Sequence, residues 1–135
     1  MGERYPTSKL LEVFTVQALT RQIMTGPHAS ERVILNMVNP GLCHSSLSRN
    51  TTGFVGVFLW LLKALLARTT ETGSRTLVLA ASGGPETNGQ YLSDGTIKQT
   101  SEFVRSEEGE ETQERVYREL MAIQEKIQPG ITKNV

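Results

Sequence analysis

The segment of residues 32–39, RVILNMVN, constrains the fold of this chain more strongly than any other. It is short, rich in β-branched residues and apolar at both odd and even positions. Because successive side chains of a strand point to opposite faces, both faces of this strand would have to be buried. The segment therefore predicts a strand over Arg32–Asn39 inside a parallel sheet with layers on both sides, and Pro40-Gly41 ends it.

Helical patterns lie on both sides of this strand in the sequence. Apolar residues spaced three or four apart predict a first helix over Tyr5–Met24, with Pro6 in its first turn, where a missing N–H does no harm. A second apolar stretch predicts a helix over Gly53–Arg68. A third helix is predicted before Pro129-Gly130, because one stripe at helical spacing is formed by Val116, Leu120, Ile123 and Ile127.

The middle of the chain is less clear. Thr76–Ala81 is a short apolar run that could be a strand or a helix, and the turn-rich residues 82–89 predict a loop. QYLSD, residues 90–94, predicts a second short strand. The alternation of helices and strands indicates an α/β layered fold, yet two strands would both be edges, so the sheet looks incomplete.

Composition excludes some classes of protein. A length of 135 residues predicts one domain, and 14 basic and 14 acidic residues cancel, so charge gives no argument for binding nucleic acid or an anionic membrane. Cys43 is the single cysteine, so an internal disulfide is impossible and a reducing compartment, the cytoplasm, is expected. The first residues carry no signal-peptide pattern.

The most apolar run, Gly53–Ala67, raises the question of a membrane. It is shorter than the roughly 20 residues that a spanning helix needs, and Lys63 interrupts it. We therefore expect no transmembrane segment. A buried helix is the favoured interpretation, and an interfacial helix is the alternative.

Tyr5 and Lys9 suggest chemistry, because residues four apart share one face of a helix. A free phenol has a pKa of about 10, and a nearby ammonium stabilises the phenolate form. A phenol in such a place can exchange a proton with the oxygen of a carbonyl or an alcohol. On spacing alone, however, an exposed tyrosine beside a solvated lysine is the simpler interpretation.

Longer stretches of the sequence decide between these interpretations. RYPTSKLLEVF carries the motif Tyr-x-x-x-Lys, VILNMVNPGLCHSSL carries a strand followed by a Pro-Gly turn, and GQYLSDGTI and ERVYRELMAIQEKIQPGI follow in order. Together they resemble the carboxy-terminal part of the short-chain dehydrogenase/reductase family, particularly the retinol-dehydrogenase-like members of filamentous fungi. The resemblance covers nearly the whole chain.

The resemblance implies roles for six residues. Tyr5 would be the general acid/base, and Lys9 would favour its phenolate and hydrogen-bond the ribose of a nicotinamide nucleotide, NADP or NAD. Pro40, Gly41 and Leu42 would line the nicotinamide pocket. Ser45 stands where the family usually has a threonine, and it keeps the hydroxyl that would hold the carboxamide.

The resemblance also implies structure beyond the site. The ambiguous run should be a helix over Gly73–Ser82, and the Gly53–Arg68 helix would belong to the substrate-side region or simply pack in the core. The family's Gly-x-x-x-Gly-x-Gly turn, which holds the cofactor pyrophosphate, is absent from the sequence, as is the serine that precedes the tyrosine helix. We therefore expect a single partial domain over residues 1–135. It would be the carboxy-terminal part of a Rossmann-like doubly wound parallel sheet that lacks the dinucleotide-binding first half.

Three functions follow as expectations. The first is an NAD(P)-dependent oxidoreductase that interconverts a carbonyl and an alcohol on a lipophilic small molecule, in fungal secondary metabolism, here in truncated form. The second is a non-catalytic fragment that docks on a full-length reductase, or forms an oligomer, through the apolar face of the Tyr5–Met24 helix at Leu10, Phe14 and Ala18. The third is the product of a pseudogene.

Neither a metal site nor a thiol nucleophile is expected. Cys43 and His44 adjoin the predicted pocket loop, but His28 is the only other histidine and there is no second cysteine.

Overall fold

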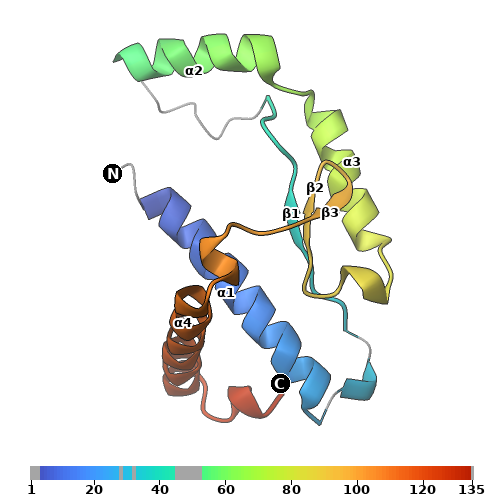
Figure 1. The fold of residues 1–135 in the computed structure, drawn as a ribbon, viewed down its shortest axis with the longest axis vertical. Helices are drawn as coiled ribbons and strands as arrows, with labels where there is room; N and C mark the ends of the chain where they lie inside the picture. Colours follow the sequence, from blue (N-terminus) through green and yellow to red (C-terminus); the bar gives the residue numbers. More distant parts are fainter. Residues whose placement is uncertain (1–3, 28, 32, 45–52, 135) are drawn as a thin grey trace.

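The structure is a computed structural model that describes residues 4–27, 29–31, 33–44 and 53–134. It is a mixed α/β arrangement with a small sheet (Figure 1). The helices are α1 (Arg4–Thr25), α2 (Gly53–Leu66), α3 (Thr70–Ala81) and α4 (Glu107–Ile127), and the strands are β1 (Met37–Asn39), β2 (Tyr91–Ser93) and β3 (Thr96–Lys98). Short 3-10 turns are η1 (Ala29–Glu31), η3 (Pro85–Thr87), η4 (Phe103–Arg105) and η5 (Ile131–Asn134).

The sheet has the order β1-β2-β3 and mixes both directions. β1 and β2 are parallel, with Met37 opposite Tyr91 and Asn39 opposite Ser93. β2 and β3 form an antiparallel hairpin. The expectation of an all-parallel sheet is thus wrong for its last strand, which the sequence analysis did not predict. The reason is the Asp94-Gly95 turn, whose two residues have φ of 56° and 74° and reverse the chain tightly.

The first strand is shorter than predicted. Residues 33–36 make no ladder, because the backbone there bonds to the loop before β2 instead. Leu35 N donates to Asn88 Oδ1 at 2.9 Å, and Gly89 N donates to Leu35 O at 2.6 Å. Val33 and Ile34 are exposed, so the prediction that both faces of the whole segment are buried is also wrong.

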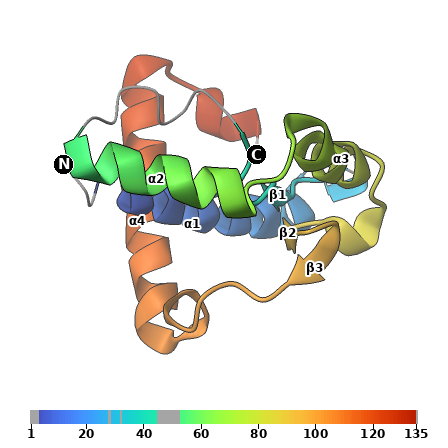
Figure 2. The same ribbon diagram turned by 90° about the horizontal axis from the view of Figure 1, so that it is seen from above.

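Helices lie on both sides of the sheet. α3 packs on one face, where Asn36 Nδ2 donates to Ala80 O at 2.9 Å, and α1 lies on the other (Figures 1 and 2). A helix was expected over Gly73–Ser82, and it begins earlier, at Thr70, because Thr69 Oγ1 accepts a bond from Thr72 N. Among the described residues, the small core takes one buried apolar side chain from each of five elements: Phe14, Met37, Ala80, Leu92 and Val104.

α4 crosses α1 on the side away from the sheet (Figure 2). Tyr117 Oη donates to Gln22 Oε1 at 2.6 Å, and Arg21 pairs with Glu110 at 2.9 Å. Phe14 of α1 is 1% exposed, and its ring lies 6.2 Å from that of Phe103 in η4. The apolar face of α1 that could have docked a partner at Phe14 is therefore covered by this chain's own carboxy-terminal elements.

α2 is the exception to this packing. Its apolar side chains are largely in solvent, with Phe54 87%, Trp60 67% and Leu65 81% exposed. The interpretation of a buried helix is therefore wrong for these residues, because α2 stands apart from the other helices and the sheet (Figure 1). Within the described residues, none of the helices combines the length and the apolar character needed to cross a membrane.

Candidate active site

Tyr5 and Lys9 lie on the first turns of α1, as the sequence predicted. Pro6 fits there because N–H groups in the first turn have no intrahelical acceptor. The helical spacing brings Lys9 Nζ to 5.8 Å from the centre of the Tyr5 ring. Tyr5 is 57% exposed and lines a cavity beside the helix.

Glu12 completes a row of polar groups on this face. Its two carboxylate oxygens each lie 2.9 Å from Lys9 Nζ. The hydrogen bond to Glu12 raises the pKa of Lys9; desolvation opposes this effect, and the charges of Glu12 and Tyr5 add to it. Sequence reasoning missed Glu12, although a carboxylate three residues after a lysine on a helix is a recognisable signal.

A cavity of about 640 Å³ lies between this face of α1 and the sheet. α1 contributes Tyr5, Lys9 and Glu12 to its lining, the end of β1 contributes Asn39 and Pro40, and β2 contributes Tyr91. Its volume lies within the range of roughly 300–1,000 Å³ that is usual for small-molecule sites. The structure thus brings Pro40, 31 residues further along than Lys9 by sequence number, to the same cavity as the tyrosine and lysine.

The other predicted pocket residues lie just beyond this lining. Gly41 adopts a left-handed φ of 75°, and its N–H donates to Asn39 Oδ1 at 2.9 Å. Leu42 O accepts a bond from Arg68 N at 2.8 Å, so the loop after the turn pairs with the chain between α2 and α3. Ser45 lies outside the described residues.

Asn39 and Tyr91 are two further polar residues of the cavity that the sequence did not predict. Asn39 Nδ2 donates to Tyr91 Oη at 2.8 Å, across the parallel pair β1-β2. Nothing local in the sequence joins residues 52 positions apart. Only the register of the two strands places them together.

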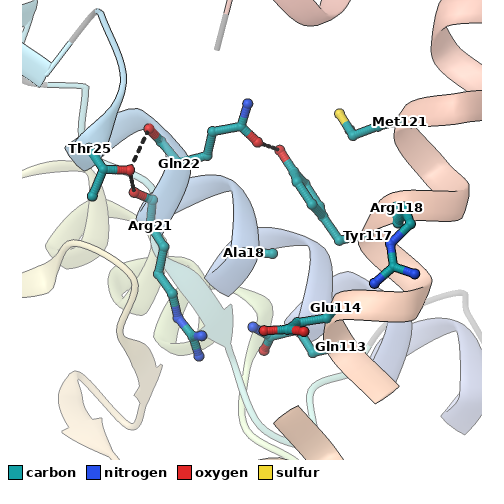
Figure 3. A pocket seen from close by; sticks show the side chains of 9 residues that line it. All are labelled: Ala18, Arg21, Gln22, Thr25, Gln113, Glu114, Tyr117, Arg118 and Met121. Atoms are coloured by element: carbon teal, nitrogen blue, oxygen red, sulfur yellow. Dashed lines mark hydrogen bonds between the residues drawn. The ribbon is translucent and has the colours of Figure 1, made fainter. Parts of the chain in front are cut away.

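A second cavity, of about 590 Å³, lies between α1 and α4 (Figure 3). Because α1 turns by 100° per residue, its lining residues Ala18, Arg21 and Gln22 face away from the side that carries Tyr5 and Lys9. Burial raises the pKa of Tyr117, whose hydroxyl is bonded to Gln22. This cavity does not contact any of the predicted site residues.

No group of three or more metal-ligating side chains occurs within the part of the chain that the structure describes. Cys43 instead packs on α3, with its Sγ 3.3 Å from Pro40 O.

Similarity to known proteins indicates which family this chain resembles. Neither a family model nor a solved structure matches the chain. Curated proteins do. The chain is 49% identical over 132 residues to the short chain dehydrogenase/reductase dmxR8 of Cryptosporiopsis sp. (strain 8999), and 46% identical over 134 residues to the short-chain dehydrogenase anuD of Penicillium roqueforti (strain FM164). It is also 33% identical over 131 residues to the short chain dehydrogenase FGM9 of Gibberella zeae.

These alignments cover 98%, 97% and 97% of this chain but 39%, 35% and 38% of the three relatives. The chain therefore spans little more than a third of the length of the curated relatives it matches, as a segment of carboxy-terminal type. Over that segment it matches fungal members of the short-chain dehydrogenase/reductase family.

Proposed function

We propose that this chain carries the acid–base half of an NAD(P)-dependent oxidoreductase that interconverts a carbonyl and an alcohol on a lipophilic small molecule, in fungal secondary metabolism. One observation supports the proposal above all others: Tyr5, Lys9 and the Pro40 turn line a single cavity. The family of the relatives supports it as well.

Tyr5 would be the proton donor in reduction and the proton acceptor in oxidation. Its hydroxyl would donate to the carbonyl oxygen of the substrate and take the proton back in the reverse reaction. The positive charge of Lys9 would stabilise the phenolate that remains after donation. When bound, a nicotinamide would supply or receive the hydride, which no side chain can do.

Lys9 can take a second role without losing its bond to Glu12. An ammonium carries three donors, and Glu12 occupies two of them. The third would remain for a ribose hydroxyl. Pro40, Gly41, Leu42 and Ser45 would form the nicotinamide end of the pocket, and either NADP or NAD fits this part of the proposal.

The remaining expectations stand as proposals of the same kind. We place the protein in the cytoplasm, on its single cysteine. We treat residues 1–135 as one part of a larger reductase domain, and oligomer formation through α1 stays a prediction for the residues that α4 leaves uncovered.

The test is a chimera, because the aligned relatives are longer than this chain. The segment of the Cryptosporiopsis relative that aligns with this chain, 132 residues, would be replaced by the matching residues of this chain. Consumption of NADPH or NADH with a panel of lipophilic ketones and aldehydes would be followed by the loss of the absorbance of the reduced nicotinamide. The chimera should be active.

Tyr5→Phe should then lower the turnover by roughly 10²- to 10⁴-fold, while nucleotide binding stays near its original level. Lys9→Met should impair both. Tyr117→Phe is the matched control, since it removes a tyrosine hydroxyl from α4, in the cavity on the other side of α1, and should leave activity unchanged. Full turnover in the Tyr5→Phe chimera would refute the proposed role.

A further inference from the structure

The side chain of Asn39 makes two hydrogen bonds that join separate parts of the candidate active site. Its Oδ1 accepts from the backbone N–H of Gly41 at 2.9 Å. Its Nδ2 donates to Tyr91 Oη at 2.8 Å. One amide group therefore fixes the Pro40-Gly41 turn and ties it to β2.

The sheet explains why these groups meet. Tyr91 lies opposite Met37 in the parallel register, and Asn39 lies two residues after Met37, on the same face. A tyrosine ring is long enough to reach the neighbouring position along the partner strand. This face is the one that looks across the cavity to Tyr5 and Lys9.

Asn39 supports the start of the turn, whereas Cys43 and Arg68 hold the loop that follows it. Pro40 has no N–H, so the Gly41 N–H is the first donor after β1, and Asn39 takes it. Gly41 also sits at φ 75°, a conformation that needs support from its surroundings. Removing the Asn39 amide would leave the Gly41 N–H without this acceptor.

We propose that Asn39 and Tyr91 are a positioning pair, which holds the Pro40-Gly41 turn against the cavity and thereby sets the affinity for the nicotinamide end of the nucleotide. This inference rests on the proposed function. Neither residue needs to touch a reacting atom, so the pair should act on nucleotide binding and leave the acid–base step to Tyr5.

The first measurement uses the whole 135-residue chain and needs no catalysis. Hydrogen exchange of the Gly41 amide, read by NMR, should become at least several-fold faster in Asn39→Ala. Asn39→Asp keeps an oxygen for the Gly41 amide and should restore the protection. Tyr91→Phe should give an intermediate rate. Tyr117→Phe, which loses a tyrosine–amide hydrogen bond between α4 and α1, should leave the exchange rate of the Gly41 amide unchanged.

The second measurement uses the chimera described above. Asn39→Ala, which loses two hydrogen bonds, should raise the KM for the nucleotide by about tenfold. Tyr91→Phe, which loses one, should raise it by about threefold. The kcat and its pH profile should stay within about twofold, with Asn39→Asp returning KM toward the parent value. A purely structural loss would lower the amount of active enzyme without this split.

The outcomes separate the two proposals. An inactive parent chimera would refute the proposed function, and with it the inference that depends on it. An active parent whose nucleotide KM is unchanged by Asn39→Ala would overturn the positioning role alone. Unchanged exchange of the Gly41 amide in Asn39→Ala would also overturn it.

Discussion

Cys43, in the loop after β1, lies directly against Gly73 of α3. A β-carbon at Gly73 would come closer than 3.0 Å to Cys43 Sγ, and 3.6 Å from the Cβ of Pro40. The same loop is held by backbone bonds, since Arg68 N donates to Leu42 O and His44 N donates to Arg68 O. The position of the loop beside the candidate active site thus depends on a helix residue that has no side chain.

This contact predicts coupling between the two positions. Gly73→Ala gains helix propensity, by up to about 1 kcal/mol, but displaces the thiol. In a Cys43→Ala background the thiol is gone, so the same change should be more favourable by about 1 kcal/mol. Urea unfolding of the parent, both single variants and the double variant measures the difference. Additive effects would show that the thiol simply rotates away at no cost.

Local features of the sequence predicted the parts of the fold that depend on neighbours in the chain. α1 and α4 follow from helical spacing and from the breakers Gly26-Pro27 and Pro129-Gly130. The Asp94-Gly95 pair is equally informative, because it favours a tight hairpin turn, so β3 was predictable from the sequence. The exposure of α2 could not be predicted, because an apolar run does not show what lies around it.

The same distinction between local and long-range contacts applies to the candidate site. Tyr5 and Lys9 were predictable because four residues of helix fix their relation, and Glu12 could have been found in the same way. Asn39 and Tyr91 could not, since their contact depends on strand register. The separation of Lys9 and Pro40 along the sequence does not indicate their distance in space. Only the packing of α1 on the sheet places both at one cavity.

The Lys9–Glu12 pair predicts a dependence on pH. The bond to Glu12 raises the pKa of Lys9 above its ordinary value of 10.5. On the alkaline side, the pair's contribution to stability is therefore complete up to that value and is lost as the pH rises through the higher pKa of the folded state. Glu12→Gln should return the pKa of Lys9 toward 10.5, as measured by NMR titration of its Nζ and Cε resonances. Glu114→Gln, on α4, is the control, and an unchanged titration in Glu12→Gln would show that the pair does not persist in solution.

The β2-β3 hairpin predicts a strong preference for glycine at position 95. Gly95 has φ 74°, and a β-carbon there would lie 3.0 Å from Leu79 Cδ1. Gly95→Ala should therefore lower the free energy of unfolding by about 1–2 kcal/mol. Asp94→Asn is the matched control: asparagine tolerates the left-handed φ of 56° and loses only a half-exposed ion pair with Arg68, which is worth less than about 1 kcal/mol. Equal stability of the Gly95→Ala chain and the parent would mean that the turn has another conformation.

The start of α4 predicts the most severe single change. Ser106 caps the helix, as its Oγ accepts from Gly109 N at 3.1 Å and donates to Phe103 O at 2.7 Å. Gly109 is buried so closely against this turn that a β-carbon would overlap the carbonyl of Phe103, a backbone group that cannot move without disrupting η4. Gly109→Ala should destabilise the chain by about 3 kcal/mol, despite its better helix propensity.

Ser106→Ala should cost about 1 kcal/mol, and exposed Glu108→Ala, in the same turn, less than about 0.5 kcal/mol. Thermal unfolding followed by circular dichroism ranks the three, and a Gly109→Ala chain that melts with or above Glu108→Ala would contradict the close packing of α4 on η4.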